Sequence, residues 1–154
     1  MILVTGATGP VGSEVVKQLV EAGQKVRALV RDPAKAKFDK AVEVVVGDLT
    51  KPETLKAAFA GIDKAFVLVN GPELDRLEAN AFDAAKRAGV KHIVKMSGGI
   101  EGDRKSDVMA GTVLLKWHRD SEQRLRELGI NWTILRPGVF ASNVLPRRQC
   151  RADR

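Results

Sequence analysis

The chain has 154 residues, of which 44% are hydrophobic and 29% charged, and a formal net charge of +7 at pH 7. This length suits one domain, and the composition is that of a globular protein, which excludes a disordered or fibrous one. No apolar run approaches the roughly 18–20 residues of a membrane span, no secretory signal is recognisable, and the single cysteine, Cys150, cannot form an internal disulfide, so we expect a cytoplasmic protein without a membrane partner.

The positive surplus is concentrated at the end of the chain. Residues 144–154 carry four arginines against one aspartate, and the preceding residues hold the remaining excess of four basic residues. No stretch of that larger part interleaves basic with aromatic residues, and tyrosine is absent. We therefore expect no nucleic-acid partner. An excess of this size is ordinary for a domain that binds a phosphate-rich cofactor.

Short apolar runs rich in β-branched residues recur along the chain and predict six strands. Their nearly continuous hydrophobicity is typical of strands covered on both faces, as in a parallel sheet. The predicted strands are Ile2–Thr5, Lys25–Val30, Val42–Val46, Ala65–Val69, His92–Met96 and Trp132–Leu135.

Segments with helical periodicity separate these strands. Thr50 and Glu53 have the spacing of a capping box with Pro52 inside it, and Gly89 and Gly129 suit left-handed C-terminal caps. The predicted helices are Val11–Ala22, Glu53–Ala60, Leu74–Ala88 and Val113–Leu128.

The alternation of strand and helix predicts a doubly wound α/β fold of the Rossmann type over residues 1–143. We expect a parallel sheet of strand order 3-2-1-4-5-6 between two layers of helices. Residues 144–154 have no apolar periodicity, and we expect them to form a basic, disordered tail.

A glycine-rich loop, V-T-G-A-T-G-P-V-G at positions 4–12, follows the first predicted strand and opens the first helix. Gly6 permits the tight turn, Gly9 removes a side chain where the backbone would approach a pyrophosphate, and Gly12 lets the helix lie against the sheet. The helix N-terminus would offer amide groups to the phosphates. The pattern predicts a dinucleotide site, and the alternative is a strand-to-helix turn with no ligand.

The end of the second strand bears on the choice between NAD and NADP. Arg31 lies where an arginine suits the 2′-phosphate of NADP, and Lys35 would add a second positive charge. Asp32 precedes Pro33 and is either a helix N-cap or the acceptor of a ribose hydroxyl, in which case Arg31 is a solvated strand end. We expect NADP(H) to be favoured over NAD(H).

Further candidates follow the third, fourth and fifth strands, because ligands of open α/β sheets bind at the carboxyl ends of the strands. Asp48 would accept from the adenine amino group, or else cap the next helix in competition with Thr50. Ordinary turn chemistry is the alternative for the others. The candidates for contact with the dinucleotide are Asp48, Leu49, Val69, Asn70, Gly71 and Ser97.

The chain resembles the atypical short-chain dehydrogenases/reductases in three segments: T-G-A-T-G-P-V-G at 5–12, V-R-A-L-V-R at 26–31 and E-V-V-V-G-D-L at 43–49. The run W-H-R-D-S-E-Q to A-S-N at 117–143 more specifically resembles their NmrA-like branch. That branch contains NADPH-dependent quinone and dye reductases and redox-sensing regulators. The resemblance implies that Arg31 contacts the 2′-phosphate. It also implies that Pro137, Gly138 and Phe140 lie near the nicotinamide, and that the glycine-loop contacts come from Gly6, Thr8, Gly9, Pro10, Val11 and Gly12.

The catalytic residues are not evident, because short-chain dehydrogenases ordinarily use a Tyr-x-x-x-Lys pair and this chain has no tyrosine. The corresponding helix carries His118 and Glu122, one turn apart. His118 is a candidate proton relay oriented by Glu122, and the alternative is a surface ion pair or a polar contact that supports residues 98–111. Ser97 and Lys116 are further candidates, and no metal site is expected.

The resemblance ends after Asn143, whereas the related proteins continue into a smaller lobe that faces the substrate. Residues 144–154 are expected to be either a native tail or the product of a truncated or shifted reading frame. A missing lobe would expose apolar surface and allow homo-oligomers. We expect an NADPH-dependent reductase of a quinone- or dye-like acceptor. The alternatives are a non-catalytic NAD(P)-sensing regulator that binds a protein partner, and a nucleotide-binding fragment without activity.

Overall fold

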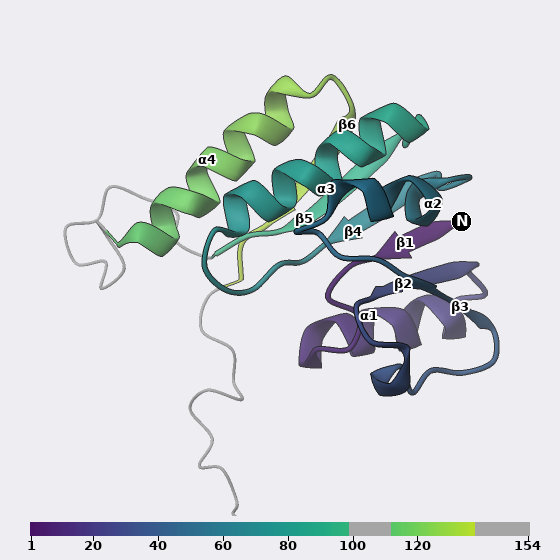
Figure 1. Ribbon diagram of the computed structural model, residues 1–154. Helices are drawn as coiled ribbons and strands as arrows, with labels where there is room; N and C mark the ends of the chain where they lie inside the picture. The colour runs from purple at the N-terminus through teal and green to yellow at the C-terminus, as the bar shows by residue number, and fades with distance from the viewer. Residues whose placement is uncertain (99–111, 138–154) are drawn as a thin grey trace, which may run out of the picture.

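The computed structural model describes residues 1–98 and 112–137 (Figure 1). Six strands form one sheet in the order β3-β2-β1-β4-β5-β6, and each neighbouring pair is parallel. This is the predicted doubly wound order. The strands are β1 (Ile2–Val4), β2 (Val26–Val30), β3 (Val42–Val46), β4 (Lys64–Val67), β5 (His92–Met96) and β6 (Asn131–Leu135).

Helices cover the two faces of the sheet unequally. Figure 1 shows α2, α3 and α4 on one face and α1 on the other, as right-handed crossovers in both directions from β1 require. There are also two short 3₁₀ turns among the described residues: η1 follows β2, and η2 directly precedes α2. The bounds are α1 (Pro10–Glu21), η1 (Pro33–Lys35), η2 (Pro52–Thr54), α2 (Leu55–Phe59), α3 (Leu74–Ala88) and α4 (Val113–Glu127).

The apolar core is divided by the sheet. The larger part, under α2, α3 and α4, contains Phe59, Phe82 and Ile93. The smaller part, under α1, contains Val16 and Phe66. Both faces of the central strands are therefore buried, which explains why these strands are apolar at successive positions. No helix in the described ranges has the length and apolarity to cross a membrane.

Two helix ends test the predicted caps. Gly89 and Gly129 both have φ of 76°, as predicted for the left-handed residue after a helix. The predicted capping box is wrong, because η2 begins after Lys51 with no side-chain cap. The amide of Thr50 donates instead to Asp48 Oδ1, 2.8 Å away, so a local Asx turn has replaced the cap.

A fully buried ion pair links β5 to α3 and α4. Lys95 and Glu78 are both 0% exposed, and Lys95 Nζ lies 2.6 Å from Glu78 Oε2. The Ser121 hydroxyl of α4 donates to the same oxygen. Burial raises the pKa of Glu78, and the charge of Lys95 opposes that rise. Glu78 Oε1 has no hydrogen-bond partner among the described residues.

We expect Lys95→Met to destabilise the protein by about 3–5 kcal/mol, because it leaves the Glu78 carboxylate buried without its counter-charge. The double variant Lys95→Met/Glu78→Leu removes both charges and should recover most of that loss. Urea denaturation at pH 7 measures both differences. A single variant as stable as the wild type, or a double variant no better than the single, would contradict this account of the pair.

Candidate functional site

The glycine loop brings the main chain of β1 and α1 into close contact. Gly6 has φ of 61°, and a Cβ there would lie 2.8 Å from the carbonyl oxygen of Leu68. A Cβ on Gly12 would lie only 2.2 Å from the Gly6 carbonyl oxygen. The Gly9 amide donates to that same oxygen at 3.0 Å and closes the turn. The predicted roles of Gly6 in the turn and of Gly12 in close packing are confirmed.

The N-terminus of α1 presents unpaired amide groups at this loop. Pro10 is its first residue, and Gly9, the N-cap, provides no capping side chain. The amides of Val11 and Gly12 have no acceptor among the residues that the structure describes, and the first turn contains no acidic residue. Thr8 is exposed beside them. The helix dipole and these amides favour an anion here.

Thr5 joins the two central strands directly below the loop. Its hydroxyl donates to the Leu68 carbonyl oxygen at 3.0 Å and accepts from the Leu68 amide at 2.9 Å. The strand order reverses between β1 and β4, so Thr5 lies at the topological switch point of the sheet. Thr5 was not among the predicted site residues. A polar residue ending an apolar strand was the available signal.

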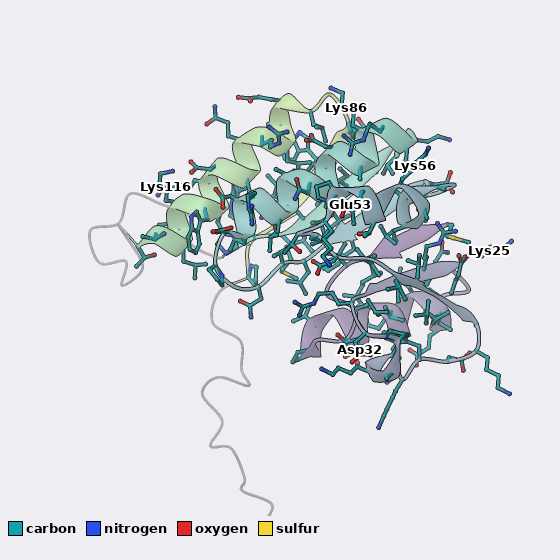
Figure 2. The ribbon with its side chains drawn as sticks, in the orientation of Figure 1. Lys25, Asp32, Glu53, Lys56, Lys86 and Lys116 are labelled. Atoms are coloured by element: carbon teal, nitrogen blue, oxygen red, sulfur yellow. The ribbon has the colours of Figure 1, made fainter. Side chains whose placement is uncertain are left out.

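The end of β2 places three charged side chains near the glycine loop. Asp32 Oδ1 accepts from the Ala34 amide at 3.0 Å and caps η1, which confirms the N-cap interpretation of Asp32 (Figure 2). Lys35 Nζ lies 3.8 Å from the other carboxylate oxygen. Arg31 is exposed and makes no hydrogen bond or ion pair with a described residue. Its guanidinium group is therefore available to a ligand.

The loop after β3 is held by local bonds. Thr54 Oγ1 accepts from the Asp48 amide at 2.9 Å. The hydrogen bond from the Thr50 amide lowers the pKa of Asp48, and the charges of Arg31 and Lys51 lower it further. Asn80 of α3 donates to the Leu49 carbonyl oxygen at 2.8 Å. The alternative that Asp48 caps the next helix is wrong, because its carboxylate accepts from the Thr50 amide within the loop and η2 begins after Lys51. The contact of Asp48 with adenine stays a prediction.

The loop between β4 and α3 has an unusual backbone. Val69 packs against the larger part of the core, whereas Asn70 is exposed. Gly71 has φ of 122°, and Glu73, the N-cap of α3, has φ of 56°. A left-handed conformation is costly for a residue with a Cβ. Glu73 therefore adopts a strained backbone conformation at the N-terminus of α3.

At the ends of β5 and β6 the structure assembles a cluster around Glu122. Its carboxylate accepts from Ser97 Oγ at 2.7 Å, Arg136 Nε at 2.9 Å and Arg126 Nη2 at 3.0 Å. Burial alone raises the pKa of Glu122, but these hydrogen bonds outweigh burial and lower the pKa to about 2. Ser97 also donates its amide to the Leu135 carbonyl oxygen at 2.8 Å. The carboxylate is charged at neutral pH.

His118 is not oriented by Glu122, and the two do not form a surface ion pair. The Glu122 oxygens accept from Ser97 and two arginines, and His118 Nδ1 is buried without a partner among the described residues. The imidazole ring packs against Gly98, where a Cβ would lie 2.7 Å from His118 Cδ2. Burial and the charge of Lys95 lower the pKa of His118 to about 4, despite the opposing charge of Glu122.

The remaining candidates are placed as follows. Lys116 is paired with Asp120 on α4, and Figure 2 shows it pointing away from the sheet. Pro137 directly follows Arg136 at the end of the described chain. Gly138, Phe140 and residues 144–154 lie outside the described residues. Apart from Lys116, the described candidates follow the carboxyl ends of the strands or lie close to them.

The buried charges behind this edge, Lys95 and Glu78, were not predicted from the sequence. Lys95 interrupts an otherwise apolar strand core, and Glu78 lies at helical spacing on the apolar stripe of α3 with Leu74, Ala81 and Phe82. A charged residue on a buried face was the available signal, because such a residue requires a partner.

Comparison with known proteins gives consistent results. Residues 6–152 match the family model described as NAD(P)H-binding. The chain is 45% identical over 148 residues to an NAD(P)H azoreductase of Xenophilus azovorans, with 94% of this chain and 50% of that protein covered.

Two solved structures are similar to this fold. One is an NADPH-dependent quinone oxidoreductase from Escherichia coli complexed with NADPH, with 30% identity, a TM-score of 0.80, and coverage of 93% of this chain and 50% of that one. The other is the Citrobacter sp. triphenylmethane reductase complexed with NADP(H), with 33% identity, a TM-score of 0.78, and coverage of 92% and 50%. The chain thus spans about half the length of these relatives.

Proton NMR should show one histidine ring titrating with a pKa of about 4, and the variant His118→Gln should remove that signal. The chain has two histidines, so the variant assigns the signal. Because the unfolded chain binds this proton at its ordinary pKa of 6.5, stability should fall as the pH drops from about 6.5 to about 4. A His118 pKa at or above 6.5 would contradict the buried environment described.

Proposed function

The chain belongs to the NAD(P)H-binding family, in the NmrA-like branch of the atypical short-chain dehydrogenases/reductases, and from this membership we propose that it is the nucleotide-binding part of an NADPH-dependent reductase. The observation that carries the proposal is the contact between Gly6 and Gly12. This contact brings the main chain after β1 against the first turn of α1, where the amides of Val11 and Gly12 have no acceptor among the described residues.

The residues at the site fit a dinucleotide. The unpaired amides of Val11 and Gly12 suit a diphosphate, and the exposed Arg31 suits a 2′-phosphate. NADPH, when bound, supplies a hydride. The protein would contribute by holding the cofactor on α1 and by shaping the ends of β4, β5 and β6 around its nicotinamide half.

For the acceptor we propose a quinone- or dye-like molecule. The similar proteins are named as an azoreductase, a quinone oxidoreductase and a triphenylmethane reductase, and this supports an acceptor of that kind. No contact of the described residues favours a sensor without catalysis. We also propose that the protein is located in the cytoplasm, as expected from its single cysteine.

The purified chain should bind NADPH and oxidise it when a naphthoquinone is added, whereas Gly9→Ala should weaken NADPH binding by about tenfold or more, since its methyl group would meet the diphosphate. The φ of −82° at Gly9 suits alanine, but the new Cβ would lie 3.3 Å from the Gly6 carbonyl oxygen, a tight contact that requires this backbone group to shift by a few tenths of an ångström. The melting temperature of Gly9→Ala therefore distinguishes a loss of NADPH binding from a loss of fold.

Fluorescence titration, absorbance at the NADPH band and thermal unfolding measure these three quantities, and Ser13→Ala in the same turn is the matched control. Binding without oxidation would favour the sensor alternative over the reductase. A wild-type chain that binds no NADPH would contradict the proposed site.

Arg31 decides the preference for NADPH in this proposal. Arg31→Ala should weaken NADPH binding by about tenfold or more and leave NADH binding nearly unchanged, because only NADPH carries the 2′-phosphate. Lys37→Ala, which changes an exposed lysine in the loop after η1, is a control for the loss of one positive charge in this region. Dissociation constants of both nucleotides measure the effect. An equal loss for NADPH and NADH would reject the role of Arg31.

A further inference from the structure

Glu122 connects three elements through one carboxylate. It lies on α4, and it accepts hydrogen bonds from Ser97 directly after β5, from Arg136 directly after β6, and from Arg126 one turn along its own helix. Arg136 binds it through both Nε and Nη2, which is the bidentate geometry that fixes direction as well as distance.

Burying this carboxylate is costly unless all its oxygens are satisfied. Glu122 is 5% exposed and Ser97 is 4% exposed. Ser97, Arg126 and Arg136 donate four hydrogen bonds to the two carboxylate oxygens of Glu122, and these bonds lower its pKa. Through these side-chain bonds Glu122 fixes the distance between the ends of β5 and β6. The backbone bond from the Ser97 amide to the Leu135 carbonyl oxygen joins the same two ends.

The position of the cluster relates it to one half of a bound dinucleotide. In doubly wound folds each half of the sheet takes one mononucleotide, and the dinucleotide crosses the switch point. The β1–β3 half carries the glycine loop and Arg31. The β4–β6 half, which ends in Ser97 and Arg136, therefore faces the nicotinamide mononucleotide.

We propose that Glu122 is a positioning residue for the nicotinamide half of the cofactor. Because Glu122 is buried and its bonds go to Ser97 and Arg136, it acts on the ends of β5 and β6 rather than on the ligand itself. Loss of the cluster loosens this edge and leaves the adenosine half of the site as it was. The inference rests on the proposed function, because it presupposes that a dinucleotide binds at this edge.

Two ligands separate this role from a merely structural one. Glu122→Gln keeps the shape of the side chain and removes its charge, so the two arginines lose their carboxylate. We expect its dissociation constant for NADPH to rise by about tenfold. Its dissociation constant for adenosine 2′,5′-bisphosphate, which has no nicotinamide half, should stay within about twofold of the wild-type value. Isothermal titration calorimetry measures both.

Glu127→Gln is the matched control, because it removes an exposed carboxylate from the same helix and should change neither constant. Ser97→Ala removes one hydroxyl and should shift the NADPH constant in the same direction by a smaller factor. It serves also where Glu122→Gln folds poorly.

An equal loss for both ligands, or an unchanged NADPH constant in Glu122→Gln and Ser97→Ala, would overturn the inference. A wild-type chain that binds neither ligand would contradict the proposed function, and the inference would fail with it. A wild-type chain that binds both ligands, with the selective loss in the variants, supports both.

Discussion

The contact between the Gly6 carbonyl oxygen and the first turn of α1 is the constraint on which the site depends. A Cβ at Gly12 would lie 2.2 Å from that oxygen, so helix and strand approach as closely as main chain allows. This approach aims the unpaired amides of α1 at the switch point, where Thr5 ties β1 to β4. Local backbone chemistry and the strand order thus define the same place, and an anion bound there would meet both.

A second constraint comes from the charges behind the sheet. The Lys95–Glu78 pair and the Glu122 cluster bury ionised groups where apolar packing would serve stability equally well. Both lie on the β5 side of the molecule and both bond to α4, whose Ser121 and Glu122 are neighbours in sequence. The helix is therefore held to the ends of the strands in one orientation, and this orientation shapes the half of the edge opposite the glycine loop.

The features predictable from sequence are those that local chemistry dictates. Two-sided burial makes the central strands apolar at successive positions, and glycine is required where φ is positive or where no Cβ fits, as at Gly6 and Gly12. The Thr50 capping box failed because the nearby Asp48 competed for the same amide. The partners of Glu122 and Lys95 could not be paired from sequence, because the bonds cross from helix to strand over many residues and depend on how α3 and α4 pack.

The buried ion pair also limits how the sequence of this protein can drift. Replacing Lys95 or Glu78 alone leaves one buried charge without a partner in an interior that cannot solvate it, whereas replacing both residues together removes both charges. We therefore expect the two positions to change together during evolution. A substitution at one position should be accompanied by a compensating substitution at the other. Among distant homologues, the same location should hold either two opposite charges or two hydrocarbon side chains, and seldom one of each.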